Sequence, residues 1–483
     1  MKPMMLRFII RIAVVVIGIT ISSCFHYVHA ESVEPLFLNV YRATESGRVE
    51  MLQSRIERDS AIAISKRDNR MMLELYDWTS GEHSIPVDSV LYCAHRTLAL
   101  PAVKVWLDDY PEATTLWEKD LYLNARICIE GNGMVESLDT MALSVKGRGN
   151  STWQMPKKPM RLKFAKKTSI AGMKKAKNFV LLNNYVDPTL MKNVTAMWLA
   201  ERLGVPYANK MVACHLFLND HYLGAYTLTH KVGLNSGSVS EIDESKGVLL
   251  ELSTEFDEKY KFRSIYTDQP VMIKDPDLDE IAAESPDSIT PDQLLDIWRH
   301  DFNRAERLAM QNRGEEAFDV ESVVSYIMLF DICGNEEIGY PKSLYLHKEA
   351  PGDSVKYYLG PAWDFDVAFS CPQRPLWLTP WLSRLRDTPG IHARYVERLK
   401  EFVNDTYPEL IRFINQYSEM ITTASELNAN RWPEEYKFGG WADVSPSYPS
   451  DGHVSRLKEW INRRVEFLSW YYGITSPPGP DRD

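Results

Sequence analysis

Short apolar runs alternate with polar stretches along the first half of the chain, and this alternation predicts β-strands. It begins at residues 31–99, where runs such as EPLFLNVYRA are each followed by a polar segment. Further strands are predicted, in chain order, over residues 99–109, 122–133, 137–153, 157–167, 211–232 and 246–253. The pattern therefore indicates a β-rich first half, with a hairpin at residues 211–232 that turns at an Asn-Asp step.

Helical signals appear first at residues 187–205. Asp187 or Thr189 can cap this helix, Pro188 suits its first turn, and Gly204 is placed to end it.

The second half of the chain is more helical. A polar linker from residue 281 leads into a helix predicted over residues 291–312, and a more apolar, buried helix is predicted over residues 320–336. Strands are predicted again over residues 343–349 and 356–370, and most of the chain after residue 375 has helical periodicity. The fold class expected from this order is α+β, with a β-rich N-terminal region and a helical C-terminal third.

The composition is that of an ordinary globular protein. The chain has 483 residues, of which 45% are hydrophobic and 25% are charged, and its formal net charge is -11. This length allows two or three domains, or one large domain with appendages. The negative net charge argues against binding of nucleic acid through bulk electrostatics.

The N-terminal residues 1–30 resemble a secretory signal, because basic residues precede an apolar run of about a dozen residues and then small residues. Two cleavage sites compete. One lies before Glu31, and the other precedes Cys24 in a lipobox-like ISSC sequence whose cysteine would be lipidated. We expect an exported protein that is either secreted or anchored through a lipid at the cell surface or in the periplasm. The tail 476–483 is expected to be disordered.

Five cysteines remain after Cys24, and they are widely scattered with no CxxC motif. This spacing argues against a zinc ribbon or a redox motif, and we expect most of these cysteines to be small buried hydrophobic residues.

A glycine-bearing turn, KGRGNSTW, occupies residues 146–153. Glycines on both sides of Arg148, followed by short polar side chains, can bring backbone N–H groups close to a phosphate. The spacing matches neither a Walker A loop nor GxGxxG, so this motif alone is also consistent with an ordinary polar turn.

The next segment, KKPMRLKF, alternates basic and apolar residues. On a strand, Arg161 and Lys163 would lie two residues apart on one face, opposite an apolar face. Such a cluster is either a solvated surface or a source of a phosphate-binding cation.

Asp364 and Asp366 lie inside the apolar run PAWDFDVAFS. On a strand they would point the same way, and like charges so close need a cation. A hard divalent ion such as Mg²⁺ takes one or two carboxylates together with substrate phosphates. Upstream of this pair, the segment DICGNEEIGYPKS follows the apolar helix and is a candidate catalytic loop.

Taken together, these motifs resemble the spore-coat protein H (CotH) kinase family of secreted or surface-exposed, atypical protein-kinase-like proteins. The matching stretches run in the family's order over roughly residues 100–475. Residues 31–99 form a β-rich N-terminal region before them, which is either a separate binding module or an extension of the kinase lobe. They are KGRGNSTW, KKPMRLKF, NFVLLNNYVDPTLMKNVTA, LFLNDHYLGAYTLTHKV, GVLLELS, PVMIKDPD and GPAWDFDVAFS. The resemblance implies a divergent two-lobed protein-kinase-like fold that binds ATP with Mg²⁺ or Mn²⁺ and phosphorylates serine or threonine of secreted or surface proteins.

The resemblance also implies roles for individual residues. Asp364 resembles the metal-binding aspartate, with Asp366 as a helper, and either Arg161 or Lys163 would pair with phosphate. Glu201 or, in competition with it, Glu251 would form the ion pair with that cation. The phosphates would be covered by Gly147, Arg148, Gly149, Asn150 and Ser151. The candidate catalytic residues are Asn335, Glu336 and Glu337.

The chain departs from the family's pattern in this catalytic loop. Related chains often carry an aspartate where this chain has Glu336 and Glu337. A displaced carboxylate can cost about 10²-fold in rate, so the alternative to a kinase is a catalytically decayed, kinase-like surface binding or structural protein. A glycan hydrolase built on two carboxylates is less favoured, since it leaves the cationic strand unexplained.

Overall fold

The computed structural model describes residues 100–284, 289–432 and 451–476, together with the backbone of six strands between residues 37 and 95. These six strands form two sheets with the orders β2-β1-β6 and β3-β4-β5, which confirms the strands predicted in this region. Their bounds are β1 Phe37–Ala43, β2 Val49–Gln53, β3 Ser60–Arg67, β4 Arg70–Asp77, β5 Gly81–Pro86 and β6 Val90–His95. The predicted signal, Cys24 and residues 477–483 of the predicted tail lie outside the described residues.

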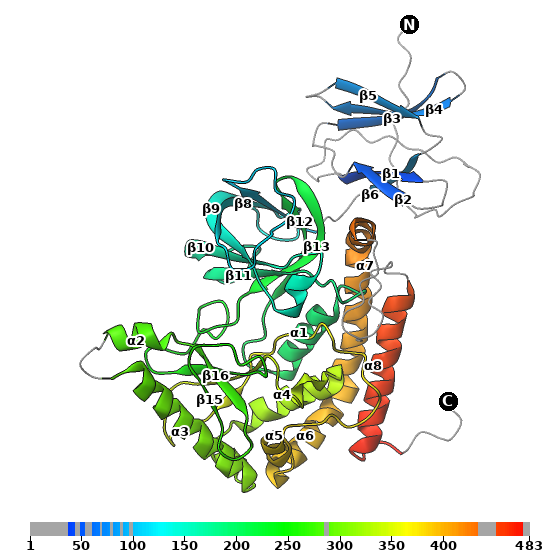
Figure 1. The fold of residues 1–483 in the computed structure, drawn as a ribbon. Helices are drawn as coiled ribbons and strands as arrows, with labels where there is room; N and C mark the ends of the chain where they lie inside the picture. The colour runs from blue at the N-terminus through cyan, green and yellow to red at the C-terminus, as the bar shows by residue number, and fades with distance from the viewer. Residues whose placement is uncertain are drawn as a thin grey trace.

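A closed β-barrel follows, with the strand order β10-β11-β13-β12-β7-β8-β9 (Figure 1). The barrel closes where β9 and β10 pair in antiparallel fashion, and β7 and β12 form a parallel pair within it. The strands are β7 Ala102–Leu107, β8 Leu123–Glu130, β9 Leu138–Gly147, β10 Met160–Thr168, β11 Ala176–Leu182, β12 Met211–Leu218 and β13 His221–His230. Alternate residues of β8 and β10 are buried, as the apolar and polar alternation predicts for strands with one face on a core.

A second sheet lies beyond the barrel in the chain and has the order β15-β16-β14-β17-β18. Its central strands β14 and β17 are buried along their whole length. The strands are β14 Val248–Leu252, β15 Lys261–Arg263, β16 Pro270–Asp275, β17 Leu344–Lys348 and β18 Tyr358–Leu359.

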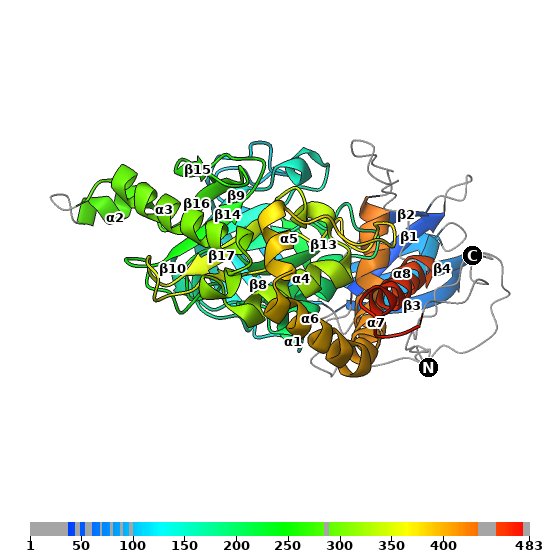
Figure 2. The same cartoon turned by 90° about the horizontal axis from the view of Figure 1, so that it is seen from below.

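Helices make up most of the remaining chain and pack below the barrel in the view of Figure 1. They are α1 Lys192–Leu203, α2 Leu278–Glu284, α3 Pro291–Met310, α4 Val320–Cys333, α5 Pro380–Arg386, α6 Pro389–Glu401, α7 Tyr407–Arg431 and α8 Asp451–Tyr471. Shorter helical turns are η2 Ser151–Gln154, η3 Gly314–Glu316, η4 Glu336–Ile338 and η5 Phe402–Thr406. Helix α1 packs on α4, and α7 reaches the barrel at β13. Helices α2 and α3 extend to one end of the molecule (Figure 2).

Most of the predicted elements are confirmed, but the start of one helix, the linker from residue 281 and the strand predicted over residues 356–370 need correction. Of that last range only Tyr358–Leu359 forms a strand, β18. The hairpin does turn at Asn219 and Asp220, which both have positive φ. Helix α1 ends at Gly204 as predicted, but it begins only at Lys192, where the Asp187 carboxylate accepts the N–H of Lys192. The linker expected from residue 281 was wrong in its first part, since α2 runs through it.

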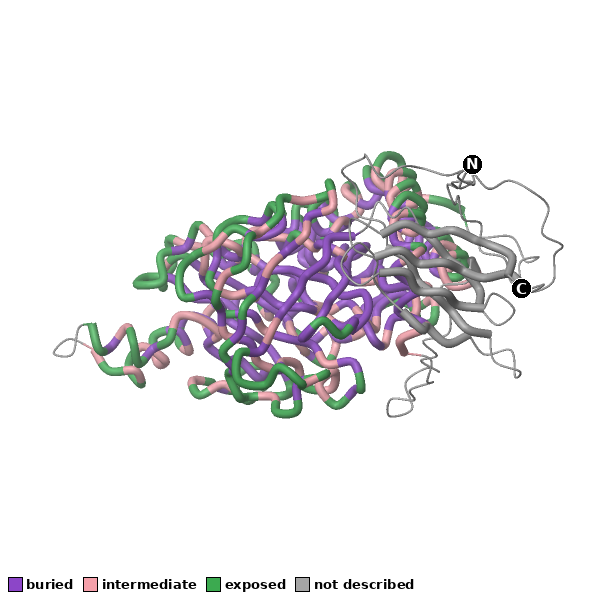
Figure 3. The backbone as a smooth tube through the Cα atoms, turned by 90° about the horizontal axis from the view of Figure 1, so that it is seen from above, coloured by how far each residue is buried: buried purple, intermediate pink, exposed green. Residues whose placement is uncertain are grey.

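Two large apolar clusters account for most of the buried core (Figure 3). One fills the barrel, and the other joins α1, the second sheet and the helices around α4. Cys214, Cys333 and Cys371 are buried in these clusters, as expected for small hydrophobic residues. Among the described residues, no helix combines the length and apolar character needed to cross a membrane.

Two buried histidines predict a loss of stability in mild acid. Burial lowers the pKa of His215 and of His347 to about 4, from 6.5. Between pH 6.5 and 4 the unfolded chain therefore binds protons that the folded chain does not, so stability falls as pH falls through this window. Full burial makes this effect on the order of 3 kcal/mol for each histidine.

The test is the pH dependence of the unfolding free energy in His215→Gln and His347→Gln. We expect each variant to lose less stability between pH 6.5 and 4.5 than the parent protein does. His221→Gln, at the exposed tip of the hairpin, is the control and should keep the parent slope. If the unfolding free energy changed equally with pH in the parent and the three variants, the low pKa values assigned to His215 and His347 would be contradicted.

Candidate functional site

The glycine-bearing segment forms a packed connection between β9 and β10. Gly149 has φ +83°, and a Cβ there would lie 2.2 Å from Thr152 Oγ1. A Cβ on Gly147 would overlap the ring of Trp153 at 2.3 Å. Both positions therefore require glycine, and they flank Arg148 in the chain.

Arg148 extends from this connection toward an acidic cluster. Burial lowers the pKa of its guanidinium, and Asp364 is the charge that most strongly opposes this shift, with Asp366 and Glu251 acting in the same direction. The guanidinium also lies 5.9 Å from the ring centroid of Trp363. Arg148 is thus a cation contributed by the barrel to a group of acids on the second sheet and its loops.

The other predicted residues of this segment lie at the surface. Asn150 is exposed, and its Oδ1 accepts a hydrogen bond of 3.1 Å from Lys119. Ser151 is half-buried and begins η2.

Asp364 and Asp366 do not lie on a strand, so that part of the sequence prediction was wrong. Residues 361–370 form an irregular segment, and Asp364 has φ +68°, which costs a non-glycine residue roughly 1–2 kcal/mol. Two hydrogen bonds hold this conformation. Asn335 donates to the Asp364 carbonyl over 3.1 Å, and the Phe365 N–H donates to Asn193 Oδ1 over 2.8 Å.

Glu337 belongs to the same acidic cluster. Helix α4 ends at Gly334 in a left-handed conformation, and Asn335 Oδ1 then accepts the N–H of Glu337 at 3.1 Å. Burial raises the pKa of Glu337, and repulsion from Asp364 and Asp366 raises it further. The pKa of Asp366 is raised by burial and by Asp364. Three carboxylates thus share one small region, which we call the acidic cluster (Glu337, Asp364 and Asp366).

Lysines on two sides partly balance this charge. Lys192, at the start of α1, lowers the pKa of Asp366, and Lys342 lowers the pKa of both Asp366 and Glu337. Lys342 also lies 3.7 Å from Glu255, which ties the loop after α4 to the turn after β14.

Glu336 points elsewhere. It forms an ion pair of 2.5 Å with Arg374, and both side chains are substantially exposed. Of the two adjacent glutamates that the sequence left open, Glu337 is therefore the one placed in the acidic cluster.

Arg161 and Lys163 share the outer face of β10, as predicted from their spacing. Arg161 donates through Nε and Nη2 to Asn178 Oδ1, at 3.2 and 2.9 Å, and its charge lowers the pKa of Lys231. Lys163 is exposed, with its Nζ 5.3 Å from the ring centroid of Tyr122.

Neither Glu201 nor Glu251 forms the ion pair that was expected with Arg161 or Lys163. Glu201 is exposed near the C-terminal end of α1, because the helix turns this position away from the core. Glu251 is buried on β14, but Lys274 is its partner at 2.7 Å. Lys274 also lies 2.7 Å from Glu258, so one lysine bridges two carboxylates.

Sequence reasoning missed Lys231 and Lys274. Burial lowers the pKa of Lys231, Asp275 opposes that shift, and both Arg161 and Lys274 favour it. These residues lie in stretches used only for their family resemblance, THKV and PVMIKDPD. The sequence signal that could have revealed them is a lysine at the end of an apolar strand, which occurs at Lys231 and at Lys274.

The acidic cluster is not a complete metal cage. In the part of the chain that the structure describes, no group of three or more His, Cys, Asp or Glu side chains is arranged to hold a metal ion.

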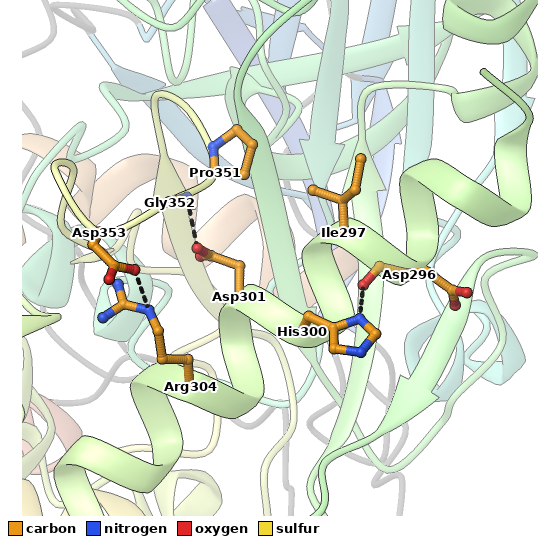
Figure 4. A pocket seen from close by; sticks show the side chains of 8 residues that line it. All are labelled: Asp296, Ile297, His300, Asp301, Arg304, Pro351, Gly352 and Asp353. Atoms are coloured by element: carbon orange, nitrogen blue, oxygen red, sulfur yellow. Dashed lines mark hydrogen bonds and ion pairs between the residues drawn. The ribbon is translucent and has the colours of Figure 1, made fainter. Parts of the chain in front are cut away.

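A surface pocket of about 440 Å³ lies elsewhere, against α3 (Figure 4). Its polar groups engage one another: Arg304 Nε lies 2.8 Å from Asp353, and the Gly352 N–H donates to Asp301 over 2.8 Å. Its lining residues are Asp296, Ile297, His300, Asp301, Arg304, Pro351, Gly352 and Asp353. None of the residues predicted from the sequence to form the functional site lines this pocket, so the acidic cluster remains the candidate site.

Fold and site together define a mixed α+β protein in which a barrel arginine faces the half-buried carboxylates of Asp364 and Asp366. The family model described as CotH kinase protein matches residues 145–468. The chain therefore belongs to the CotH kinase protein family, as its motifs indicate, and membership indicates a kinase-like function. A search of curated proteins gives no match.

Proposed function

We propose that this protein is an exported atypical kinase that binds ATP with Mg²⁺ or Mn²⁺ and transfers phosphate to serine or threonine of secreted or surface proteins. The observation that carries the proposal is that Arg148 and Glu337 each interact with Asp364 and Asp366. These residues come from separate segments of the chain, which the fold brings together. A cation beside carboxylates that repel one another is an arrangement suited to a polyanionic nucleotide and its metal.

The two-lobed arrangement is part of the proposal. The barrel would form one lobe, and the helices with the second sheet would form the other. Arg148 is the predicted cation that faces the acidic cluster, so we assign phosphate contact to Arg148 and to the backbone of residues 147–150. Arg161 and Lys163 would then act at the rim, through long-range attraction.

Glu337 is the proposed acceptor of the substrate proton. As the acceptor hydroxyl oxygen forms its bond to the γ-phosphorus, the bond from that phosphorus to the β–γ bridging oxygen breaks and ADP leaves. Burial and the two aspartates raise the pKa of Glu337 to about 9, and a cation bound at Asp364 and Asp366 would oppose this shift. The Glu337 carboxylate, once ionised, would accept the hydroxyl proton. Asn335 holds both the Glu337 N–H and the Asp364 carbonyl, and it thereby fixes the spacing of proton acceptor and metal ligand.

The residues present fit a divalent ion. Asp364 and Asp366 are two hard oxygen ligands whose repulsion a cation would relieve, and Mg²⁺ commonly takes one or two carboxylates with phosphates and waters. When bound, the ion would neutralise charge on the transferring phosphate.

Export is a separate part of the proposal and rests on the sequence of residues 1–30. We propose cleavage either before Glu31 or before Cys24, the second with a lipid anchor. Determining the N-terminal residue of the exported chain distinguishes the two, and an uncleaved N-terminus would contradict both.

Nucleotide binding and phosphoryl transfer test the proposed activity directly. The purified protein with Mn²⁺ and labelled ATP should transfer label to itself or to an acidic model protein. ATP at 100 times its Kd should stabilise the protein by about 2.7 kcal/mol, and EDTA should remove this gain. If neither label nor an ATP-dependent thermal shift appears, the kinase proposal fails and a decayed, kinase-like binding protein is favoured.

A further inference from the structure

Two exposed aromatic side chains stand beside the loop that carries Glu337. Trp377 is 84% exposed and Tyr340 is 44% exposed. Tyr340 follows Glu337 by three residues, and Trp377 lies on the segment between the acidic cluster and α5. We call these two side chains the aromatic platform.

The platform is fixed to the Glu337 loop by a close backbone contact. A Cβ on Gly339 would lie 2.5 Å from the Trp377 carbonyl oxygen and 3.2 Å from Trp377 Cβ. Only glycine allows the two segments to approach this closely. The ion pair between Glu336 and Arg374 joins the same two segments a few residues away.

The exposure of Trp377 is a built feature of its segment. Leu376 is buried, and Leu378 packs against the same core cluster, so the residues on both sides of Trp377 are anchored. The Arg374 carbonyl accepts a hydrogen bond of 2.6 Å from the buried Arg464. The exposed indole of Trp377 therefore lies on an anchored segment, where its large apolar surface is available to a partner.

We propose that the aromatic platform binds the acceptor polypeptide, through an apolar side chain placed within three residues of the serine or threonine to be phosphorylated. This inference rests on the proposed function, because it places the acceptor hydroxyl at Glu337. Three residues of chain span at most about 11 Å, which limits the distance from Glu337 to Tyr340. An extended peptide covers that distance in about three residues, which sets the spacing of acceptor and anchor.

The platform carries little net charge. Glu336 is neutralised by Arg374, so recognition depends on burial of apolar surface. Binding should therefore change little between low and physiological salt, unlike binding to a charged patch.

A peptide selection tests the inference without requiring catalysis. The full chain, with Mn²⁺ and a non-hydrolysable ATP analogue, is presented with a library of 12-residue peptides that carry a fixed central serine. We expect the selected peptides to carry an aromatic or large aliphatic residue within three positions of the serine. Trp377→Ala should weaken their binding at least about 10-fold, and Tyr340→Ala should weaken it to a smaller extent.

Trp117→Ala is the matched control, since Trp117 is 48% exposed on a connection of the barrel and should not affect peptide binding. Peptides that bind Trp377→Ala as tightly as the parent protein would overturn the inference, as would a selection that enriches no peptide. A dimer that is lost in Trp377→Ala would also overturn it, because a second copy would then cover the platform.

The two proposals fail separately. Peptide binding that depends on the platform, without any label transfer, would contradict the proposed kinase activity and support the proposed docking surface. If label is transferred to a peptide and the KM for that peptide is unchanged in Trp377→Ala, the kinase activity is supported and the docking surface is contradicted.

Discussion

Asp364→Asn should reduce phosphoryl transfer by about 10³-fold or more, because it removes a charged oxygen ligand at the position proposed for the metal. The fold should tolerate this change well. Asparagine has nearly the same shape, and it adopts positive φ more readily than most residues, so the +68° conformation is retained. The variant relieves repulsion with Glu337 and Asp366 but also removes the charge that most favours the Arg148 guanidinium. Because these effects oppose each other, the melting temperature of the metal-free protein should change little.

Asp268→Asn is the control for this experiment. Asp268 is also an aspartate with positive φ, at +54°, but it is exposed on the turn between β15 and β16 and pairs with Arg263. The activity of the Asp268→Asn variant and its stabilisation by Mn²⁺-ATP should match those of the parent protein. If Asp364→Asn keeps both as well, Asp364 is not a metal ligand, and the kinase proposal loses its central residue.

The β-rich half of the fold could be predicted from the sequence because its signals are local. Alternating burial in β10, the Asn219-Asp220 turn and the C-terminal Gly204 of α1 each depend on neighbours along the chain. Closure of the barrel between β9 and β10 and the parallel pairing of β7 with β12 depend on distant segments, and no local pattern specifies them.

The candidate site shows the same division. The sequence predicts Asp364 as a site residue but assigns it to a strand. Apolar alternation cannot reveal the hydrogen bonds with Asn335 and Asn193 that hold this segment in its left-handed conformation. Spacing alone also could not choose between Glu336 and Glu337. The choice is made by Arg374, which is 38 residues further along the chain.

The cations were the least predictable part of the site. Arg161 and Lys163 are prominent because they lie close together in the sequence, yet Arg148 faces the acidic cluster. The direction of an arginine side chain at the end of a strand depends on the packing of the following turn. Here that packing includes the Trp153 ring against Gly147, a contact between two residues that only the folded turn brings together.

Arg464→Met should destabilise the protein by about 3–5 kcal/mol, because it leaves a buried carboxylate without its cation. Arg464 is fully buried on α8 and donates to the Asp331 carbonyl and the Arg374 carbonyl, both over 2.6 Å. It also lies 3.5 Å from Asp331 Oδ1, while Tyr395 donates to the other carboxylate oxygen. Burial raises the pKa of Asp331, and Arg464 opposes that shift. The measurement is the unfolding free energy in urea at pH 7.

The neighbouring Arg463 provides the matched control. It is exposed and pairs with Glu459 one helical turn away, so Arg463→Met should change stability by less than about 0.5 kcal/mol. Adding Asp331→Asn to Arg464→Met should recover part of the lost stability, since the unpaired charge is then removed. Equal stability of the two methionine variants would show that Arg464 does not hold α4 to the segment at Arg374. The loop after α4 carries Glu337, and the segment at Arg374 carries Trp377. The Arg464 contacts therefore connect both segments, and with them the proposed proton acceptor and the proposed docking platform, to one helix, α8.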